Sequence, residues 1–397
     1  MNPRIPLAAI QSFHGELTAL RRDLHAHPEL GFEEVRTSGI VASALQSYGI
    51  EVHRGIGKTG VVGIIRGRGT DSGRMVGLRA DMDALPMSED NKFAHRSTKS
   101  GLMHGCGHDG HTTMLLGAAR YLAHTRDFDG TVVLIFQPAE EGRGGARAML
   151  EDGLFDTYPC DAIYALHNWP GLPPGTIGVN PGPMMAAADR FELIVKGKGG
   201  HGAHPYQTID PVVAAAHIIT ALQSVVSRNV NPLDSAVVSI GSMQAGNPGA
   251  MSVIPSEARL VGTVRTFRRS VQEQVEQRMR EVAQGVAQAF GASAEMNYDR
   301  LFPATLNTPQ HAHLVADIAT ELLGREHVIR DLTPSMGSED FSFMLQQRPG
   351  AYFRLGQGGA ESGCVLHNSR FDFNDEVIPL GSAMFCALAE RGLPLAQ

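Results

Sequence analysis

Apolar positions in the first half of the chain follow two spacings, one typical of helices and one typical of buried strands. Three leucines recur three or four residues apart within 9–27, which predicts an amphipathic helix. Residues 131–136 and 162–166 are continuous apolar runs, a pattern typical of strands buried on both faces of a mainly parallel sheet. The other elements predicted here are helices over 36–48 and 111–124 and strands over 61–66 and 74–80.

The middle of the chain has a different order of elements, β-α-β-β-α-β, which is that of a ferredoxin-like unit. We therefore predict an inserted ferredoxin-like α+β domain at 187–300. Residues 1–186 and 301–397 are predicted to form the two parts of one α/β domain. The strands of the insertion are predicted at 191–196, 236–241, 258–267 and 293–299, its helices at 210–227 and 270–290, and the returning segment has a strand at 351–355 and a helix at 379–391.

Composition and charge narrow the possible classes of protein. Of 397 residues, 43% are hydrophobic and 19% are charged, so a large folded core is expected. The net charge is −7 and no basic run occurs, which argues against a nucleic-acid or membrane-surface partner. No stretch of about 18 apolar residues indicates a membrane span. The apolar stretch near the N-terminus is short and is interrupted by a proline, which argues against a signal peptide. The four cysteines show no disulfide pattern, which favours a cytoplasmic location.

A glycine-rich segment at 103–111 brings cysteine and histidine close together just before a predicted helix. Cys106 and His108 are two residues apart, and the glycines around them allow both side chains to turn toward one point. We predict that both bind a metal; the alternative is a polar loop with one buried cysteine. The reserve candidates are His104, His111 and Asp109, of which Asp109 can instead orient a ligand.

Two adjacent carboxylates, Glu140 and Glu141, follow the apolar run at 131–136. Ligands of open α/β sheets gather at the carboxyl ends of the strands. Neighbouring carboxylates repel each other, so a cation is a natural partner, and one carboxylate can bind metal while the other transfers protons. The alternative is a solvated helix start, where negative charge is favourable.

Two further histidines occupy comparable positions. His167 ends the apolar run at 162–166, and His367 follows a predicted strand in the returning segment. A lone histidine is more often structural, so the prediction depends on the convergence of several such side chains. One structural zinc takes four ligands and one catalytic zinc takes three, so five candidates favour a two-metal site. The five are Cys106, His108, Glu141, His167 and His367.

Taken together, these segments resemble the aminoacylase/carboxypeptidase family of co-catalytic metallohydrolases. The resemblance is to the branch of hippurate hydrolase and the indole-acetyl–amino-acid hydrolases, and it implies a metallopeptidase-like α/β/α catalytic domain. The segments span nearly the whole chain in order, and in combination they are specific. They are 79–86, 104–111, 137–142, 167–169, 197–205, 338–341 and 367–368.

The resemblance implies roles for the residues of this site. It makes Glu140 the general base and Glu141 a metal ligand, and it implies that Asp83 orients the site. In much of the family a histidine ligand stands where this chain has Asp81, and an aspartate stands near Cys106, so this chain follows the cysteine-containing branch. A thiolate favours zinc, while carboxylate and imidazole also suit manganese, and cobalt or nickel are further candidates for the two divalent ions.

The inserted domain carries three further candidates. The resemblance implies that His201 reaches the oxyanion, often from a partner subunit, in preference to His204. It implies that Arg265 binds the substrate carboxylate, a task suited to a guanidinium. Where the family commonly has an asparagine this chain has Ser252, so we consider Asn247 as its substitute. Alternatively, 197–205 is a glycine-rich turn and Arg265 an ordinary strand residue. A homodimer is expected, since the insertion offers sheet edges and a helix face for pairing.

The predicted function is cleavage of the amide bond of small N-acyl amino acids by a metal-dependent amidohydrolase. Three alternatives remain. The first is a dipeptidase or carboxypeptidase, the second a deacetylase of an intermediate such as N-acetyl-diaminopimelate, and the third a metal-binding relative without activity. The third is expected to lack Glu140 or a ligand, and all of these residues are present.

Overall fold

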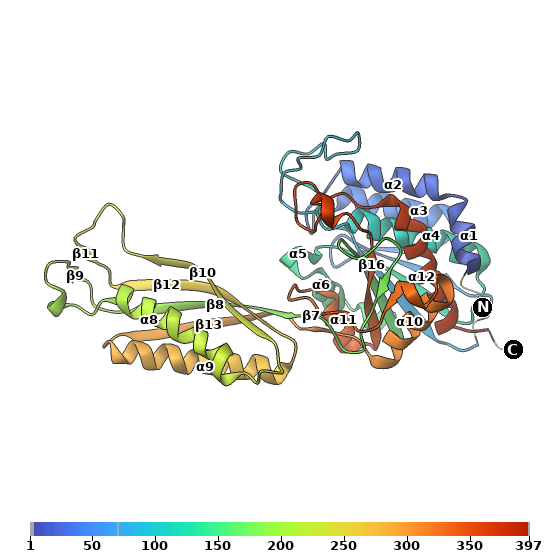
Figure 1. Cartoon of the computed structure of the whole chain (residues 1–397). Coiled ribbons are helices and arrows are strands. Elements are labelled where there is room, and N and C mark those ends of the chain that lie inside the picture. The colour runs from blue at the N-terminus through green and yellow to red at the C-terminus, as the bar shows by residue number, and fades with distance from the viewer. Residues whose placement is uncertain (1–3, 70, 396–397) are drawn as a thin grey trace. The chain divides into compact units, whose positions relative to one another are not determined.

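The computed structural model describes residues 4–69 and 71–395, and the chain divides into two compact units (Figure 1). Unit 1 comprises Met1–Met184, Leu306–Thr333 and Asp340–Gln397, of which the described residues are discussed here. Unit 2 comprises Met185–Thr305 and Pro334–Glu339. The chain thus leaves unit 1 and returns to it twice.

Unit 1 contains an eight-stranded mixed sheet with the order β1-β2-β4-β3-β5-β16-β6-β15. Its centre is parallel, through the pairs β4–β3, β3–β5 and β5–β16, while β1, β2 and the β16–β6 pair add antiparallel neighbours. The strands are β1 (Glu51–Ile56), β2 (Gly60–Arg66), β3 (Met75–Asp81), β4 (Thr131–Gln137), β5 (Ala162–Trp169), β6 (Ile177–Gly178), β15 (Val328–Ile329) and β16 (Gly350–Gly356).

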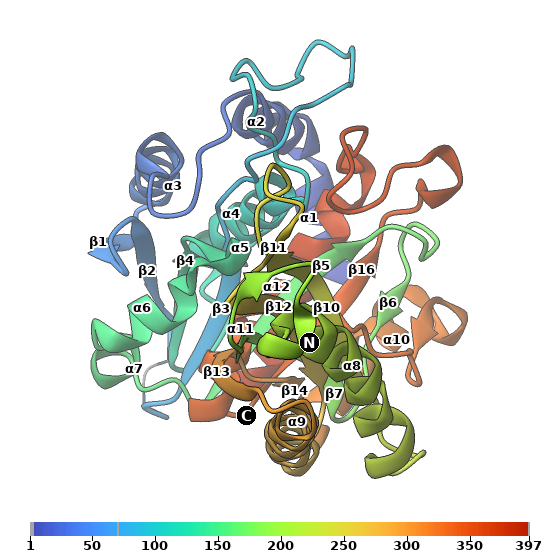
Figure 2. The ribbon, with the colours of Figure 1, turned by 90° about the vertical axis from the view of Figure 1, so that its left-hand side faces the viewer.

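Helices cover this sheet and explain why its central strands are apolar throughout. In β4, Val132 and Leu134 belong to the core cluster shared with α4 and α12, yet Val133 and Ile135 on the opposite face are also fully buried. Helix α3 lies over β1 and β2 (Figure 2). The helices are α1 (Arg4–Gln11), α2 (His14–Ala26), α3 (Val35–Ser47), α4 (His108–Thr125), α5 (Glu140–Arg143), α6 (Gly145–Glu151), α7 (Leu154–Thr157), α10 (Pro309–Leu323), α11 (Phe341–Gln347) and α12 (Ile378–Gly392).

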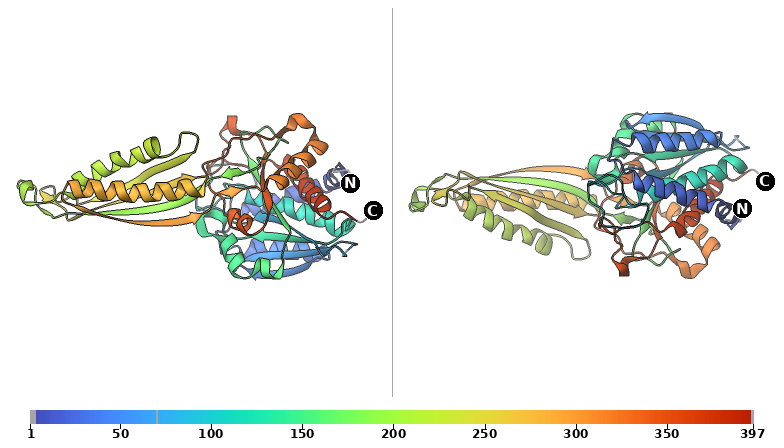
Figure 3. Two further views of the ribbon diagram at one scale, coloured as in Figure 1. Left: turned by 90° about the horizontal axis from the view of Figure 1, so that it is seen from below. Right: turned by 90° about the horizontal axis from the view of Figure 1, so that it is seen from above.

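Unit 2 is a four-stranded antiparallel sheet with the order β10-β12-β8-β13 and two helices on one face (Figure 3). The chain order β8-α8-β10-β12-α9-β13 is the predicted ferredoxin-like order. Two short strands, β9 and β11, form a separate antiparallel pair outside the four-stranded sheet. The elements are β8 (Ala187–Lys196), β9 (Gly200–His201), α8 (Pro211–Ser224), β10 (Ala236–Ala245), β11 (Val253–Ile254), β12 (Glu257–Thr266), α9 (Arg269–Ala289) and β13 (Ser293–Phe302).

Helix α8 is the most apolar helix of unit 2, and its sequence explains where it begins. Asp210 caps it, accepting the backbone N–H of Val212 at 2.8 Å, and Pro211 occupies the first turn. With the π-helical turn that follows, Pro211–Asn229 has the length and the mean hydropathy, 1.2, of a membrane span. Ile218 and Leu222 are fully buried in the core of unit 2, and 33% of this apolar window is buried, so core packing accounts for part of the apolar composition.

The main differences from the sequence-based elements lie at polar or short segments. The helix predicted over 9–27 is two helices, α1 and α2, because the chain turns at Ser12 and Phe13. The sequence pattern did not predict β1, a strand that is partly exposed, or helix α10. The segment Pro334–Glu339 groups with unit 2 rather than with the C-terminal part of the first domain.

Candidate metal centre

The segment before α4 is held in a conformation that only glycine adopts easily. Gly107 precedes the helix with φ of +97°, in the left-handed region. A Cβ atom at this position would lie 2.3 Å from Oδ1 of Asn168. The turn therefore allows Cys106 and His108, on either side of Gly107, to face the carboxyl end of β5.

The structure brings the five predicted ligands into two groups that share Cys106. One group is Cys106, His108 and His167, and the other is Cys106, Glu141 and His367; within each, the potential ligand atoms lie within 4.8 Å of one another. The Sγ atom of Cys106 is 3.3 Å from Nε2 of His167, and Nε2 of His367 is 3.2 Å from Oε1 of Glu141. Two such groups side by side would suit a site that holds two neighbouring cations.

The tautomer of His108 is fixed by Asp83. Nδ1 of His108 faces the Asp83 backbone carbonyl at 2.9 Å and its Oδ1 at 3.2 Å. Because both neighbours are acceptors, Nδ1 carries the proton and the lone pair of Nε2 is available. Nε2 is buried and, among the described residues, makes no hydrogen bond. Oδ2 of Asp81 lies 3.7 Å from Nε2, so a cation bound here would take the place of a proton on this nitrogen.

The two adjacent glutamates are held by the same aspartate. Oδ1 of Asp83 accepts the backbone N–H of Glu140 at 3.1 Å, and Oδ2 accepts that of Glu141 at 3.0 Å. Ala139, just before them, has a left-handed φ of +53°, and its N–H donates to Glu34 at 2.8 Å. The turn after β4 is thus fixed by two carboxylates, and its side chains point into the same region as His108.

The residues around β5 hold His167 in a similar way. Nδ1 of His167 donates to the backbone carbonyl of Asn168 at 2.6 Å, which leaves Nε2 toward Cys106. The side chain of Asn168 contacts Nε2 of His111 at 2.6 Å and donates to Gln357 at 2.9 Å. The sequence could not indicate that Gln357 contacts Asn168, because the two residues are 189 positions apart in the chain.

Burial shapes the protonation of the three inner side chains. Burial raises the pKa of the Cys106 thiol well above its usual value, and the charge of Glu141 adds to this. Burial also lowers the pKa of His167 well below its usual value, so this imidazole is neutral. Burial by itself would lower the pKa of His108, but Asp81, Cys106 and Asp83 together outweigh it and raise that pKa well above its usual value. A divalent cation would compensate the charge of an ionised Cys106, so the donor set fits a metal.

In a second possible metal-binding triad, formed by Asp81, His108 and His111, the side chains of Asp81 and His111 already have hydrogen-bond partners. His111 uses both ring nitrogens, one against Oδ1 of Asp81 at 2.6 Å and the other against Asn168. Asp81 also receives Arg79, a buried arginine that further contacts Gln137 and Asp340. These residues therefore form a buried hydrogen-bond network next to the two Cys106 groups. Sequence reasoning assigned no role to Arg79.

The other reserve candidates lie outside the two Cys106 groups. His104 is buried, and neither ring nitrogen has a hydrogen-bond partner among the described residues. Burial lowers the pKa of His104 to about 4. Asp109 accepts a hydrogen bond from His25 at 2.8 Å and lies beside Arg21. The structure thus places Asp109 against its own cationic partners.

The candidates in unit 2 are spread over its length. His201 is exposed and pairs with Val253 in the β9–β11 pair, where its Nδ1 accepts the N–H of Ala203. Asn247 is exposed in the loop before β11. Arg265 is half-buried near the end of β12, opposite Ala188, and burial lowers its pKa. Within unit 2, His201 and Arg265 therefore lie at opposite ends of the sheet.

Comparison with known proteins agrees with this geometry. Residues 77–391 match peptidase family M20/M25/M40. The chain is 41% identical to hippurate hydrolase of Campylobacter jejuni, over 97% of this chain and 98% of that protein. It is 42% identical to N-acetylcysteine deacetylase of Bacillus subtilis, over 96% and 98%.

A solved structure supports the fold and the metal stoichiometry. The Bacillus subtilis YXEP protein, described as a dinuclear metal binding peptidase from the M20 family, has a TM-score of 0.84 and 39% identity. The match covers 96% of this chain and 99% of that one. With the two Cys106 groups, this supports a site for two divalent cations. The α/β fold class and the resemblance inferred from the motifs are confirmed. The chain belongs to peptidase family M20/M25/M40.

Proposed function

We propose that this protein is a metal-dependent amidohydrolase that cleaves the amide bond of N-acyl amino acids, releasing a carboxylic acid and an amino acid. The observation that carries the proposal is the position of Glu140 beside the two Cys106 groups. A carboxylate oxygen of Glu140 lies within 4.8 Å of a ring nitrogen of His108 and a carboxylate oxygen of Glu141. A base at this point can reach a water held by the ligands.

Each residue of the site has a proposed role in hydrolysis. The five ligands Cys106, His108, Glu141, His167 and His367 would hold two divalent cations, which lower the pKa of water and polarise the scissile carbonyl. Glu140 removes a proton from the attacking water and returns it to the departing amine nitrogen. Asp83 keeps Glu140 and His108 oriented through its hydrogen bonds.

The choice of metal follows from the donor set. One soft thiolate shared by the two groups favours zinc, while the imidazoles and the carboxylate also suit manganese, cobalt or nickel. We propose zinc or manganese as the physiological ions. The measurement is turnover of metal-stripped protein after each metal is added back.

The position of His201 supports a role from a partner subunit. In β8, Ala188 pairs with Arg265, whereas Lys196 lies at the other end and precedes His201 by five residues. Eight residues of strand span about 26 Å, so His201 and Arg265 of one subunit cannot both contact one small substrate. We therefore propose that Arg265 binds the substrate carboxylate, and that His201, with Asn247 nearby, reaches the oxyanion from the partner in a homodimer.

Mixing two inactive variants tests this arrangement. Glu140→Gln retains His201, and His201→Ala retains Glu140. A mixed dimer would contain one site with both residues if His201 acts from the partner, so activity should reappear when the two variants are unfolded, mixed and refolded together. His204→Ala, which changes a neighbouring exposed histidine, should retain activity by itself. Continued inactivity of the mixed dimers would place His201 in the same subunit as Glu140 or outside the reaction.

A substrate panel separates the proposed function from its alternatives. The metal-loaded protein would be tested on N-benzoyl and N-acetyl amino acids, dipeptides and N-acetyl-diaminopimelate, with ninhydrin detection of the released amine. The proposal requires the N-acyl amino acids to give the highest kcat/KM. A preference for dipeptides would indicate a peptidase, and a preference for N-acetyl-diaminopimelate a biosynthetic deacetylase. Binding of metal without any hydrolysis would indicate an inactive relative.

We also propose a cytoplasmic location. Its support is chemical, since all four cysteines are free thiols in the structure, and three of them are buried. Free thiols persist in a reducing compartment. Cell fractionation tests the location, and light scattering of the purified chain tests the dimer.

A further inference from the structure

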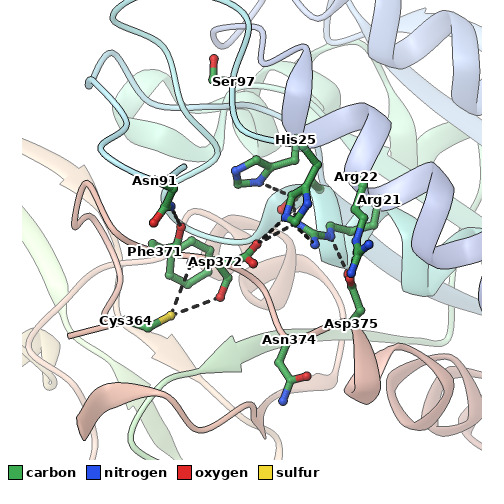
Figure 4. Close-up of polar contacts among 12 residues, drawn as sticks. Arg21, Arg22, His25, Asn91, Ser97, Cys364, Phe371, Asp372, Asn374 and Asp375 are labelled. Carbon is green, nitrogen blue, oxygen red and sulfur yellow. Dashed lines mark hydrogen bonds and ion pairs between the residues drawn. The ribbon is translucent and has the colours of Figure 1, made fainter. Parts of the chain in front are cut away.

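A fully buried arginine contacts the first turn of α4 and the segment after His367, which both adjoin proposed metal ligands in unit 1. Arg21, in α2, is 0% exposed and donates from Nε to Asp375 at 2.7 Å and from Nη1 to Asp372 at 3.0 Å (Figure 4). The same Nη1 lies 3.5 Å from Oδ2 of Asp109. His25, one turn later in α2, contacts Asp109 at 2.8 Å. We call these five residues the Arg21 cluster.

The position of the cluster in the chain connects it to the metal site. Asp109 directly follows His108, and Asp372 follows His367 by five residues. Neither acidic residue is itself in one of the two Cys106 groups. The cluster therefore adjoins proposed ligands through neighbouring residues, and α2 supplies two of its members, Arg21 and His25.

The loop that bears His367 is irregular, and contacts from other segments hold it. His367 has a left-handed φ of +59°, and its side chain is 54% exposed. Its backbone N–H donates to Gly105 at 2.8 Å. Further contacts hold the residues after His367: Asp90 donates its N–H to Ser369, Asn91 donates to Phe371, and Gln357 donates to the backbone carbonyl of Asp372 at 3.2 Å. Phe371 and Phe373 are buried in the core. In contrast, His108 begins helix α4 and His167 lies within strand β5.

The two Cys106 groups thus depend on the His367 loop unequally. The group of Cys106, His108 and His167 uses only α4, its preceding turn and β5. The group of Cys106, Glu141 and His367 needs the loop in place. A planar guanidinium that spans two carboxylates of that loop fixes its position better than separate single contacts.

We propose that Arg21 is a positioning residue for His367: by holding Asp372 and Asp375, it sets the affinity of the metal position formed by Cys106, Glu141 and His367, and leaves the other position unaffected by that hold. The proposal rests on the five residues being metal ligands, as argued above. Changes to residues that orient metal ligands typically weaken metal binding about 10–100-fold.

The test variant is Asp372→Asn, because it keeps the side-chain volume and removes one carboxylate from Arg21 while Asp375 and Asp109 remain. The matched control is Arg22→Met. Arg22 also contacts Asp375, at 2.8 Å, but its side chain is 50% exposed, and within the described part of the chain it makes no hydrogen bond or ion pair with Asp372. A second test variant, Arg21→Lys, keeps the charge but cannot span two carboxylates.

Metal-stripped full-length proteins would be titrated with MnCl2, and free Mn²⁺ would be counted by electron paramagnetic resonance. We expect wild type and Arg22→Met to bind two ions. Asp372→Asn should keep one ion at wild-type affinity and bind the other about 10–100-fold more weakly, with turnover recovering as Mn²⁺ is raised. Arg21→Lys should weaken the same position at least as much; if this variant does not fold, Asp372→Asn alone decides.

Three results would overturn the proposal. Two ions bound by Asp372→Asn at wild-type affinity would show that the hold is irrelevant to the metal. Equal weakening of both positions would indicate a general structural role. Equal weakening in Arg22→Met would show that the effect is not specific to Arg21. Failure of wild type to bind any ion is a different outcome, since it contradicts the proposed function itself.

Discussion

Asp83 faces Nδ1 of His108 with both its backbone carbonyl, at 2.9 Å, and its side-chain Oδ1, at 3.2 Å. Two acceptors around one ring nitrogen leave only one tautomer, with the Nε2 lone pair directed away. The same carboxylate accepts two backbone N–H groups of the glutamate turn. Asp83 therefore contacts two of the proposed ligands, His108 and Glu141, and the proposed base Glu140.

Asp83→Asn should weaken metal binding about 10–100-fold, because the amide presents one N–H₂ group where an acceptor is needed. Turnover at limiting metal should fall correspondingly. Isothermal titration of the metal-stripped variant measures the effect. Asp299→Asn changes an exposed aspartate of β13, in unit 2, and serves as the control. Unchanged metal affinity in Asp83→Asn would contradict the orienting role.

The two adjacent glutamates should give opposite results when each is changed to glutamine. Glu140→Gln removes the proposed base and should lower kcat about 10²–10⁴-fold while two ions remain bound. Glu141→Gln removes a ligand and should reduce the number of bound ions. Metal content by elemental analysis and kcat on an N-acyl amino acid separate the two cases. If Glu140→Gln lost metal and Glu141→Gln did not, the two assignments would be exchanged.

Gly107 should be the least replaceable glycine of the metal-binding turn. Gly107→Ala places a methyl group where φ is +97° and where Oδ1 of Asn168 is 2.3 Å away, so it should destabilise unit 1 by more than about 1 kcal/mol and weaken metal binding. Gly285→Ala is the control. It lies within α9 with no atom within 4 Å, and should raise stability by about 0.5–1 kcal/mol. Urea unfolding of both variants measures these changes.

Glu390 should make stability depend on pH. Burial raises its pKa from 4.5 to about 7, and the charge of Asp127 adds to this. The unfolded chain therefore loses this proton at lower pH than the folded chain. The contribution of Glu390 to stability is complete below pH 4.5 and is lost as pH rises through about 7.

Glu390→Gln should remove this dependence. The variant should match wild type near pH 4.5 and be more stable than wild type at pH 8, by an amount on the order of 2–3 kcal/mol. Urea midpoints measured across this pH range provide the comparison. The difference between the two proteins isolates Glu390 from other titrating groups. Parallel pH curves would mean that Glu390 is solvated or paired in solution.

Periodicity alone predicted the elements whose burial is one-sided or complete. The runs in β4 and β5 are apolar because helices cover both faces, and the stripe of α9 is apolar because one face meets the sheet of unit 2. Segments with mixed exposure, such as β1, were missed because their pattern is ambiguous. Residues in a single motif, such as Cys106 and His108, could be grouped because a glycine turn constrains them locally.

What the sequence determined by itself was a set of separate donor residues, each at the end of an element or in a tight turn. Only the tertiary structure decided that Cys106 belongs to both groups, because His167 and His367 reach it from distant parts of the chain. It also decided that Arg21 contacts Asp109 and Asp372, that Arg79 contacts Asp81, and that Gln357 contacts Asn168. Side chains of this kind have no local pattern, since their partners are fixed by the packing of strands and helices rather than by neighbouring residues.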